Sequence, residues 1–192
     1  MSRQKHYIKT YNEKDRQAYL FLNNIRHCKP NQLEIYISKN RISCYLKEHL
    51  IEKVKTLHGE YYKLTDKGYR TFEQKFIKEN CKYHSQSPEH DCRLAQFYNE
   101  LYIRFGPDNF VWKNEEDLKQ ERKLKLQEFS LNREYQRFEL LRTASVSDCV
   151  VEFLDGSALA YDVFTANYSH FDELSKAQFA DALHIPFNYD RI

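Results

Sequence analysis

The sequence predicts an α+β protein built from two domains of opposite charge. Residues 38–76 read as a helix, a strand pair and a second helix, and the chain from residue 145 reads as strand, turn, strand and helix. Residues 1–80 hold 17 Lys and Arg against 9 Asp and Glu, a net charge of +8, whereas residues 81–192 hold 13 against 19, a net charge of −6. We therefore expect three segments: a basic domain over 1–80, a linker and bridging helix over 81–107, and an acidic α/β domain over 108–192 for dimerisation or partner contact.

Three helices are expected before residue 50. The first spans residues 15–27 and is ended by Pro30, and a short helix follows at 32–36. Ser38 can cap the third helix, which begins at Lys39, because its hydroxyl accepts a hydrogen bond from a free amide. The apolar side of this third helix recurs at helical spacing and comprises Ile42, Tyr45, Leu46 and His49.

A hairpin and a closing helix complete the basic domain. Residues 53–57 and 60–64 are rich in β-branched and aromatic residues, and Gly59 supplies the positive φ that a tight hairpin often needs. Thr65 or Asp66 can cap the closing helix, in which Tyr69, Phe72 and Phe76 form an apolar stripe. Helix, hairpin and helix in this order are typical of a winged helix-turn-helix domain, here over about residues 12–80.

A winged helix that binds DNA needs a polar helix face for the major groove and positive charge for the phosphates. The basic domain meets both conditions. We expect Asn40 and Arg41 to read bases, and the remaining DNA contacts to come from Lys39, Ser43, Cys44, Lys47, Lys53, Lys55 and His58. The alternative is that these side chains solvate a helix that packs against another protein, in which case the domain binds no DNA.

The composition excludes several classes of protein. An apolar content of 41% and an aromatic content of 15%, against four Gly and four Pro, argue for globular domains and against disorder. No apolar run reaches the length of a membrane span and the start of the chain lacks the apolar core of a signal peptide, so we expect a cytoplasmic protein without membrane contact. Five scattered cysteines favour reduced thiols, and no phosphate-binding loop or other cofactor motif is present, so no cofactor is expected.

The middle of the chain contains a spacing of four zinc-ligand residue types. The pattern C-x2-H-x5-H-x-C is formed by Cys81, His84, His90 and Cys92. A single residue between His90 and Cys92 is an awkward spacing for two ligands of one metal, so we expect a turn followed by a helix over about 90–105 instead. A strand at 108–112 and a charged, solvated helix at 115–129 should follow.

The acidic domain brings two carboxylates and a lysine within reach of one another. Two apolar runs, 149–154 and 158–164, are joined by Asp155-Gly156, which predicts a hairpin. Asp148 and Asp162 could approach each other across it, Lys176 on the following helix could reach the same place, and Glu152 is a further candidate ligand. In metal-dependent phosphodiester cleavage, carboxylates hold a divalent ion and an amine polarises the phosphate. The alternative is that these carboxylates only keep strand ends soluble.

The winged-helix pattern, the segment HDCRLAQFYNELY, the hairpin SVSD...AYDVFTANY and a lysine-bearing helix occur here in that order. In this arrangement the chain resembles the replication-relaxation family and related winged-helix proteins of conjugative plasmids and transposons of Gram-positive bacteria. The resemblance implies a sequence-specific double-stranded DNA-binding protein, expected as a homodimer, that assists replication or conjugative transfer of a mobile element beside a relaxase or replication protein. A transcriptional regulator of the element and a metal-dependent DNA nuclease are the alternatives.

The C-terminal part of such proteins is similar to a restriction-endonuclease-like core. The pattern of that core is an Asp and then, on the next strand, an acidic residue, one apolar residue and a Lys. Here Asp162 is followed by Val163 and Phe164, so the lysine is missing from its usual place and only Lys176 could replace it. We therefore expect a degenerate core that serves dimerisation or partner contact.

Overall fold

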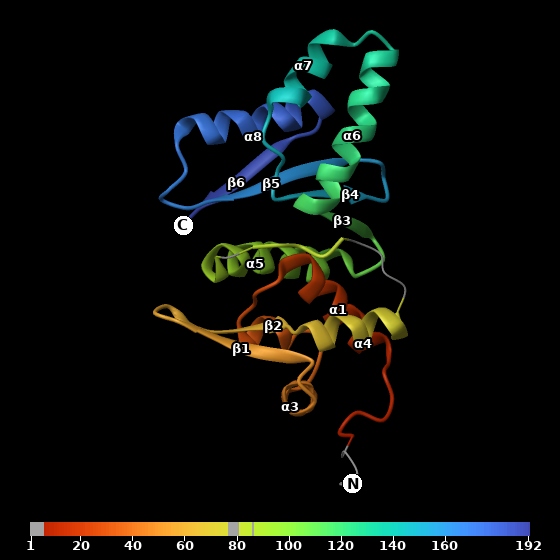
Figure 1. The fold of residues 1–192 in the computed structure, drawn as a ribbon, viewed down its shortest axis with the longest axis vertical. Coiled ribbons are helices and arrows are strands. Elements are labelled where there is room, and N and C mark those ends of the chain that lie inside the picture. The colour runs from red at the N-terminus through yellow and green to blue at the C-terminus, as the bar shows by residue number, and fades with distance from the viewer. Residues whose placement is uncertain (1–5, 77–80, 86) are drawn as a thin grey trace. The chain divides into compact units, whose positions relative to one another are not determined.

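The computed structural model describes residues 6–76, 81–85 and 87–192 and has a mixed α+β fold (Figure 1). It divides into two compact units. Unit 1 comprises the described residues up to 76 and residues 84–100, and unit 2 comprises residues 81–83 and 101–192. Helix α5 (Pro88–Phe105) contributes residues to both units, so the segment expected as a linker and bridging helix is divided between them. The expected boundary at residue 80 and Gln86 of the expected linker lie outside the described residues.

Unit 1 has the order of elements that the sequence predicts. It consists of α1 (Glu13–Ile25), α2 (Pro30–Leu33), α3 (Lys39–Lys47), β1 (Ile51–Thr56), β2 (Gly59–Leu64), α4 (Asp66–Lys75) and the first part of α5. The two strands form an antiparallel hairpin, and an antiparallel bridge between Cys28 and Tyr62 adds a third piece of extended chain to it. Several side-chain contacts join α5 to this unit. For example, the Tyr36 hydroxyl donates to Asn99 Oδ1 at 2.5 Å, and His27 Nδ1 lies 2.7 Å from Asp91 Oδ2.

Local capping fixes where these helices begin. The Ser38 hydroxyl accepts from the Arg41 amide at the start of α3, and the Thr65 hydroxyl accepts from the Gly68 amide at the start of α4. Helix α3 ends at Lys47, and His49 then takes a left-handed φ of 56° before β1 begins. The expectation that His49 packs on the buried side of the helix is therefore wrong, because the helix has ended and this side chain is exposed.

Close packing in unit 1 depends on one glycine. Gly68 lies in the first turn of α4, where the backbone of Leu50 approaches it directly. A Cβ at position 68 would lie 2.0 Å from the Leu50 carbonyl oxygen, so only glycine fits there. This contact sets α4 against the chain that enters β1.

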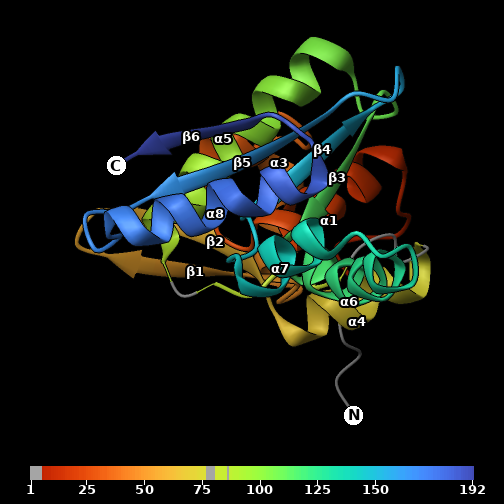
Figure 2. The same cartoon turned by 90° about the horizontal axis from the view of Figure 1, so that it is seen from above.

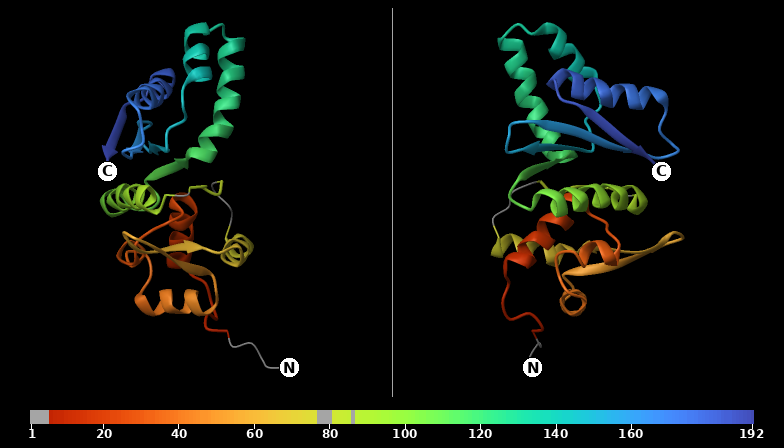
Figure 3. Two further views of the ribbon diagram at one scale, coloured as in Figure 1. Left: turned by 60° about the vertical axis from the view of Figure 1, so that its left-hand side comes forward. Right: turned by 180° about the vertical axis from the view of Figure 1, so that it is seen from behind.

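Unit 2 is a four-stranded sheet with helices packed on it. The strand order is β3 (Phe110–Asn114), β4 (Cys149–Phe153), β5 (Ala158–Phe164) and β6 (Phe187–Arg191), and the helices are α6 (Glu115–Leu131), α7 (Tyr135–Thr143) and α8 (His170–Leu183). Strands β3, β4 and β5 pair antiparallel, whereas β6 is parallel to β5, and α8 crosses between them along both strands (Figure 2). Helices α6 and α7 lie side by side in both views of Figure 3. The hydrophobic pattern of the sequence did not predict α7 or β6.

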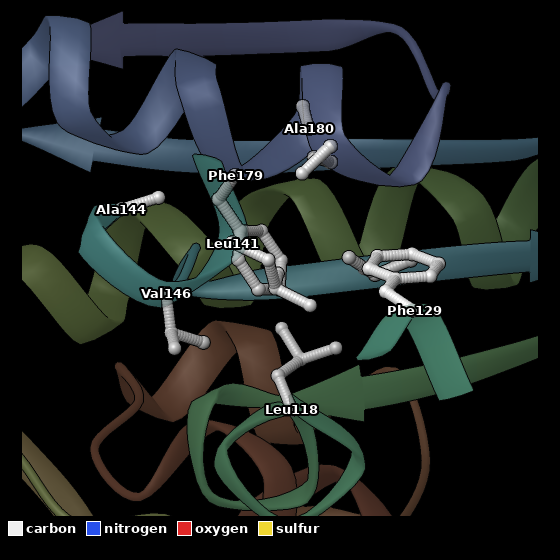
Figure 4. Close-up of a cluster of buried hydrophobic side chains, with 10 residues drawn as sticks. Leu118, Phe129, Leu141, Ala144, Val146, Phe179 and Ala180 are labelled. Atoms are coloured by element: carbon white, nitrogen blue, oxygen red, sulfur yellow. The ribbon is translucent and has the colours of Figure 1, made fainter. Parts of the chain in front are cut away.

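The core of unit 2 is unusually rich in alanine. Leu118, Leu141 and Phe179 point toward one another between α6, α7 and α8 (Figure 4). The remaining buried members include the small side chains Ala144, Ala160, Ala180 and Ala182. These alanines allow the helices to approach the sheet closely.

Two observations concern the predicted cytoplasmic location: the state of the cysteines and the character of the helices. All five cysteines are free thiols, and burial raises the pKa of the Cys28 and Cys149 thiols well above the usual value. Within the described ranges, no helix has both the length and the apolar character that a bilayer crossing needs. The cytoplasmic location stays a prediction.

Candidate nucleic-acid interface and carboxylate–lysine site

Helix α3 separates an apolar face from a polar one. Ile42 and Tyr45 are buried, whereas Lys39, Asn40 and Lys47 are exposed. The Lys39 side chain is 81% exposed, and the Lys47 ammonium lies 5.2 Å from the centre of the Tyr7 ring. Ser43 and Cys44 are half-buried beside them. The exposed residues of α3 therefore present amide and ammonium groups to a partner.

Arg41 has a different place from the one expected of it. Its Nε donates to Asp15 Oδ1 at 2.8 Å, and its Nη2 donates to Asp15 Oδ2 and to the Thr10 carbonyl, both at 2.6 Å. Asp15 is 1% exposed and also accepts the Tyr45 hydroxyl at 2.6 Å. Arg41 therefore ties α3 to α1, and this ion pair leaves Asn40 as the exposed candidate for base contacts. The pairing also raises the pKa of Arg41, chiefly through its hydrogen bond to Asp15.

The β1–β2 hairpin carries the other predicted DNA contacts. Lys55 and His58 are exposed, and Leu57 at the tip is fully exposed. Lys53 is also accessible, but its ammonium lies 2.8 Å from a Glu60 carboxylate oxygen on the facing strand. Lys55 and His58 are thus the hairpin side chains best placed to meet a phosphate backbone.

The four candidate zinc ligands do not come together. Cys81 belongs to unit 2, where its sulfur accepts the Gln120 side-chain amide at 3.1 Å, while the other three lie in unit 1. The Cys92 sulfur contacts the Gln32 side chain, and His90 Nδ1 lies 3.4 Å from Asp91 Oδ1. Across the described residues, no group of three or more metal-ligating side chains is present.

Asp148, Asp162 and Lys176 are in direct contact, as the hairpin pattern predicts. Lys176 Nζ donates to Asp148 Oδ1 at 2.5 Å and also to Asp162 Oδ1. The backbone holds the two carboxylates in place, because the Asp148 amide donates to Asp162 Oδ1 at 2.9 Å and the Val163 amide donates to Asp148 Oδ2 at 2.8 Å. All three charged residues are at least 94% buried, with exposures of 4%, 0% and 6%.

One carboxylate oxygen in this cluster has no hydrogen-bond partner. Asp162 Oδ2 is buried and unpaired among the described residues, and the nearby Ser147 hydroxyl is buried and unpaired as well. Burial raises the pKa of Asp162 to about 7, with a further upward contribution from Asp148 that the Lys176 ammonium opposes. Burial alone would lower the pKa of Lys176, but the two carboxylates raise it above its usual value. The cluster therefore holds a charged lysine and a carboxyl that titrates near neutral pH.

A polar cavity of about 380 Å³ opens onto this cluster. Asp148 and Lys176 line it, together with Tyr168, whose ring centre lies 5.6 Å from the Lys176 ammonium. Helix α6 contributes Glu115, Lys119 and Arg122 to the wall. The sequence analysis missed these three residues, although their i, i+4, i+7 spacing places them on one helix face.

Glu152 does not belong to this site. It extends from β4 to Lys113 on β3, where the ammonium lies 2.7 Å from a Glu152 carboxylate oxygen, and it lines a different cavity. The prediction of Glu152 as a further ligand beside Asp148 and Asp162 is therefore wrong. Successive side chains of β4 point to opposite faces of the sheet. The sequence alone does not show which cavity lies on each face.

Comparisons of the chain with protein-family models, with curated proteins and with solved structures found no match.

Proposed function

We propose that the protein binds double-stranded DNA through α3 and the β1–β2 hairpin, as a winged helix-turn-helix domain does. The observation that carries this proposal is the two-sided character of α3. Its apolar face is buried in unit 1, while Lys39, Asn40 and Lys47 are exposed on the other side. A helix of this kind beside an exposed basic hairpin suits a major groove and its flanking phosphates.

The charge of the first 80 residues also supports the proposal of DNA binding. Their net charge of +8 contrasts with −6 for the rest of the chain, so a polyanion should be attracted to the N-terminal part. Lys39, Lys47 and Lys55 are the expected phosphate contacts, and Asn40 is the expected base reader, since Asn pairs well with adenine.

The biological setting is proposed from the resemblance alone. A DNA-binding accessory role in replication or conjugative transfer of a mobile element, as a homodimer beside a relaxase or replication protein, agrees with a basic reading domain followed by an acidic domain. A transcriptional regulator of the same element would use the same contacts.

Selection from a randomised double-stranded DNA library, followed by affinity measurements at several salt concentrations, tests the proposal. Lys47→Ala should weaken binding to all sequences and lower the salt slope by about 1, whereas Asn40→Ala should cost about 1–3 kcal/mol on the selected site and relax one position. Lys123→Ala, which removes an exposed lysine of α6, is the matched control and should change neither value. If no sequence is retained, or if Lys123→Ala acts like Lys47→Ala, α3 serves a protein contact instead.

A second candidate function, phosphodiester cleavage, is favoured by the unpaired oxygen of Asp162. Asp148 and Lys176 line a cavity that also holds Lys119 and Arg122, and Asp162 is buried in contact with Lys176. Two carboxylates and a lysine form a donor set suited to a nucleic-acid phosphate and a divalent cation. The strand order, with three antiparallel strands and a fourth strand parallel to the third, also agrees with a restriction-endonuclease-like core that carries its lysine on α8.

Asp148 lines the cavity, and the Lys176 ammonium contacts both Asp148 and Asp162. Mg²⁺ binds through one or two carboxylates and completes its shell with water and phosphate oxygens, so Asp148 and Asp162 would suffice. When bound, the cation would stabilise negative charge on the phosphate. Lys176 would exchange a contact to Asp148 or Asp162 for a phosphate oxygen, and Arg122 and Lys119 would orient the backbone at the cavity wall.

A nicking assay on supercoiled plasmid separates this candidate from a purely structural cluster. Cutting should require Mg²⁺ or Mn²⁺ and be lost in Asp162→Asn. Asp181→Asn, a change at an exposed aspartate of α8, should retain it. Intact plasmid under every metal condition would leave DNA binding as the function and the cluster as part of the fold.

A further inference from the structure

Unit 2 contains a second cavity, which shares Arg122 with the cavity lined by Asp148. Its volume is about 540 Å³, and it lies among α6, the end of α8 and strands β3 to β5. The floor is apolar and consists of buried side chains: Leu118, Leu141, Val150 and Phe179. We call it the α6–α8 cavity.

The α6–α8 cavity has the size of a ligand pocket. Pockets for small ligands have volumes of about 300–1,000 Å³ and mostly apolar linings with a few polar groups. Eight of the fourteen residues that line the α6–α8 cavity are apolar, and the six charged residues lie at its rim.

One small side chain in the lining leaves room that a larger residue would take. Ala158 on β5 lines the cavity, beside the apolar core of unit 2. Larger apolar residues at such positions are common in sheet and helix cores and would fill the space. The chain thus folds around an opening instead of closing it.

Three cations and three carboxylates line the cavity, so its rim carries no net charge, and two of the cations are paired with carboxylates. Lys113 lies 2.7 Å from carboxylate oxygens of both Glu121 and Glu152, and Lys125 lies 2.8 Å from Glu128. The Arg122 guanidinium donates to the Arg142 carbonyl at 2.5 Å. A charged ligand would have to break one of these contacts and would meet a charge of its own sign nearby. The rim therefore disfavours an ionic ligand.

We infer that the α6–α8 cavity binds an uncharged, apolar small molecule. The apolar floor supplies the driving force through burial of hydrocarbon surface, and the paired rim charges select against anions and cations. Leu124, which also lines the cavity and is 67% exposed, offers an apolar edge at the entrance. This inference does not depend on DNA binding or cleavage.

A pair of fluorescent probes with nearly the same skeleton tests the choice of ligand class. N-phenyl-1-naphthylamine is uncharged, whereas 1-anilinonaphthalene-8-sulfonate carries a sulfonate. The neutral probe should bind the full-length protein at one saturable site with a Kd of about 10–100 μM, and the sulfonate should bind at least about tenfold more weakly. Absence of saturable binding by the neutral probe, or equal binding of both, would overturn the inference.

Substitution at Ala158 tests the location. Ala158→Leu should fill the cavity and weaken binding of the neutral probe at least about tenfold, while Ala166→Leu, at an exposed position after β5, should leave the Kd unchanged. If the Leu variant does not fold, Ala158→Val removes less space and should weaken binding by a smaller factor. An unchanged Kd in a folded Ala158 variant would contradict the location. A Kd that rises with protein concentration would also count against it, since a second copy of the chain would then be the occupant.

Discussion

The two units treat buried carboxylates differently. In unit 1, Asp15 is buried with four donors: Arg41 Nε and Nη2, the Tyr45 hydroxyl and the Asn12 amide, at 2.6–2.8 Å. In unit 2, Asp162 is buried with Oδ1 bound to Lys176 and to the Asp148 amide, and with Oδ2 unpaired. A buried carboxylate whose oxygens are all hydrogen-bonded is stabilised by the fold, whereas a buried oxygen without a partner costs free energy. The contrast therefore assigns a structural role to Asp15 and favours a binding role for Asp162.

The two units also differ in how closely their elements are packed. Unit 1 brings α4 so close to Leu50 that only Gly68 fits, while unit 2 keeps an apolar cavity of about 540 Å³. The Arg41–Asp15 ion pair fixes α3 against α1 in unit 1, and the pocket of unit 2 leaves room for a ligand. Each substitution below changes one side of this comparison.

The largest effect is expected from Arg41→Ala in unit 1. Removing the guanidinium leaves the Asp15 carboxylate buried without its cation, which should lower the free energy of unfolding by about 3–5 kcal/mol. Hydrogen exchange of the α1 and α3 amides reports the loss directly. Arg70→Ala, at an exposed position of α4, should stay within about 0.5 kcal/mol of the parent. Full stability of the Arg41 variant would refute a structural role and return Arg41 to the DNA contacts.

Gly68→Ala should destabilise unit 1 by about 3 kcal/mol, although alanine is normally the better helix former. The added Cβ would lie 2.0 Å from the Leu50 carbonyl oxygen, and a backbone atom cannot move aside as a side chain can. Chemical denaturation followed by circular dichroism measures the loss. Gln74→Ala at an exposed site on the same helix controls for helix propensity. A gain in stability at position 68 would mean that α4 packs less closely than described.

Asp162→Asn should change how the stability of unit 2 depends on pH. The pKa of Asp162 in the folded protein, about 7, lies above the unfolded value of 3.8. Between about pH 4 and pH 7 the folded state keeps this proton, whereas the unfolded chain has released it. The contribution of Asp162 to stability is therefore full below about pH 4 and is lost as the pH rises to about 7. Relative to the variant, the parent should lose about 2 kcal/mol between pH 5 and pH 8.

The single tryptophan makes this measurement specific. Trp112 is buried in β3, so its fluorescence follows the unfolding of unit 2. Asp181→Asn, on the exposed side of α8, should show the pH dependence of the parent. A difference between Asp162→Asn and the parent that stays constant from pH 5 to pH 8 would show that Asp162 is ionised throughout.

The sequence predicted those features that depend on short separations along the chain. Ser38 and Thr65 cap helices through local hydrogen bonds, and the Asp155-Gly156 turn sets a register in which Cys149 faces Tyr161. That register places Asp148 beside Asp162, so the carboxylate pair could be predicted from the hairpin alone.

The features that were missed depend on packing between distant segments. Strand β6 pairs parallel to β5 only after α8 has crossed the sheet, and its five residues carry a weak strand signal by themselves. The partner of Arg41 is 26 positions away on α1, so the residue looked free for DNA. A cavity depends on how side chains far apart in the sequence fill the space between them, so no sequence motif predicts it. The alanines of the core can be read from the sequence, but their packing cannot.

The smallest effect, and the one with the opposite sign, is expected from Ala158→Leu. In a tightly packed core the three added carbons of leucine would be destabilising by about 1–3 kcal/mol. Here the added atoms enter the α6–α8 cavity and gain dispersion contacts with its apolar floor, so the free energy of unfolding should rise by about 1 kcal/mol. Denaturation followed by Trp112 fluorescence measures it, with Ala166→Leu as the exposed control. A clear loss of stability in the Ala158 variant would mean that unit 2 is packed as closely as unit 1, and the contrast between the two units would then rest on their carboxylates alone.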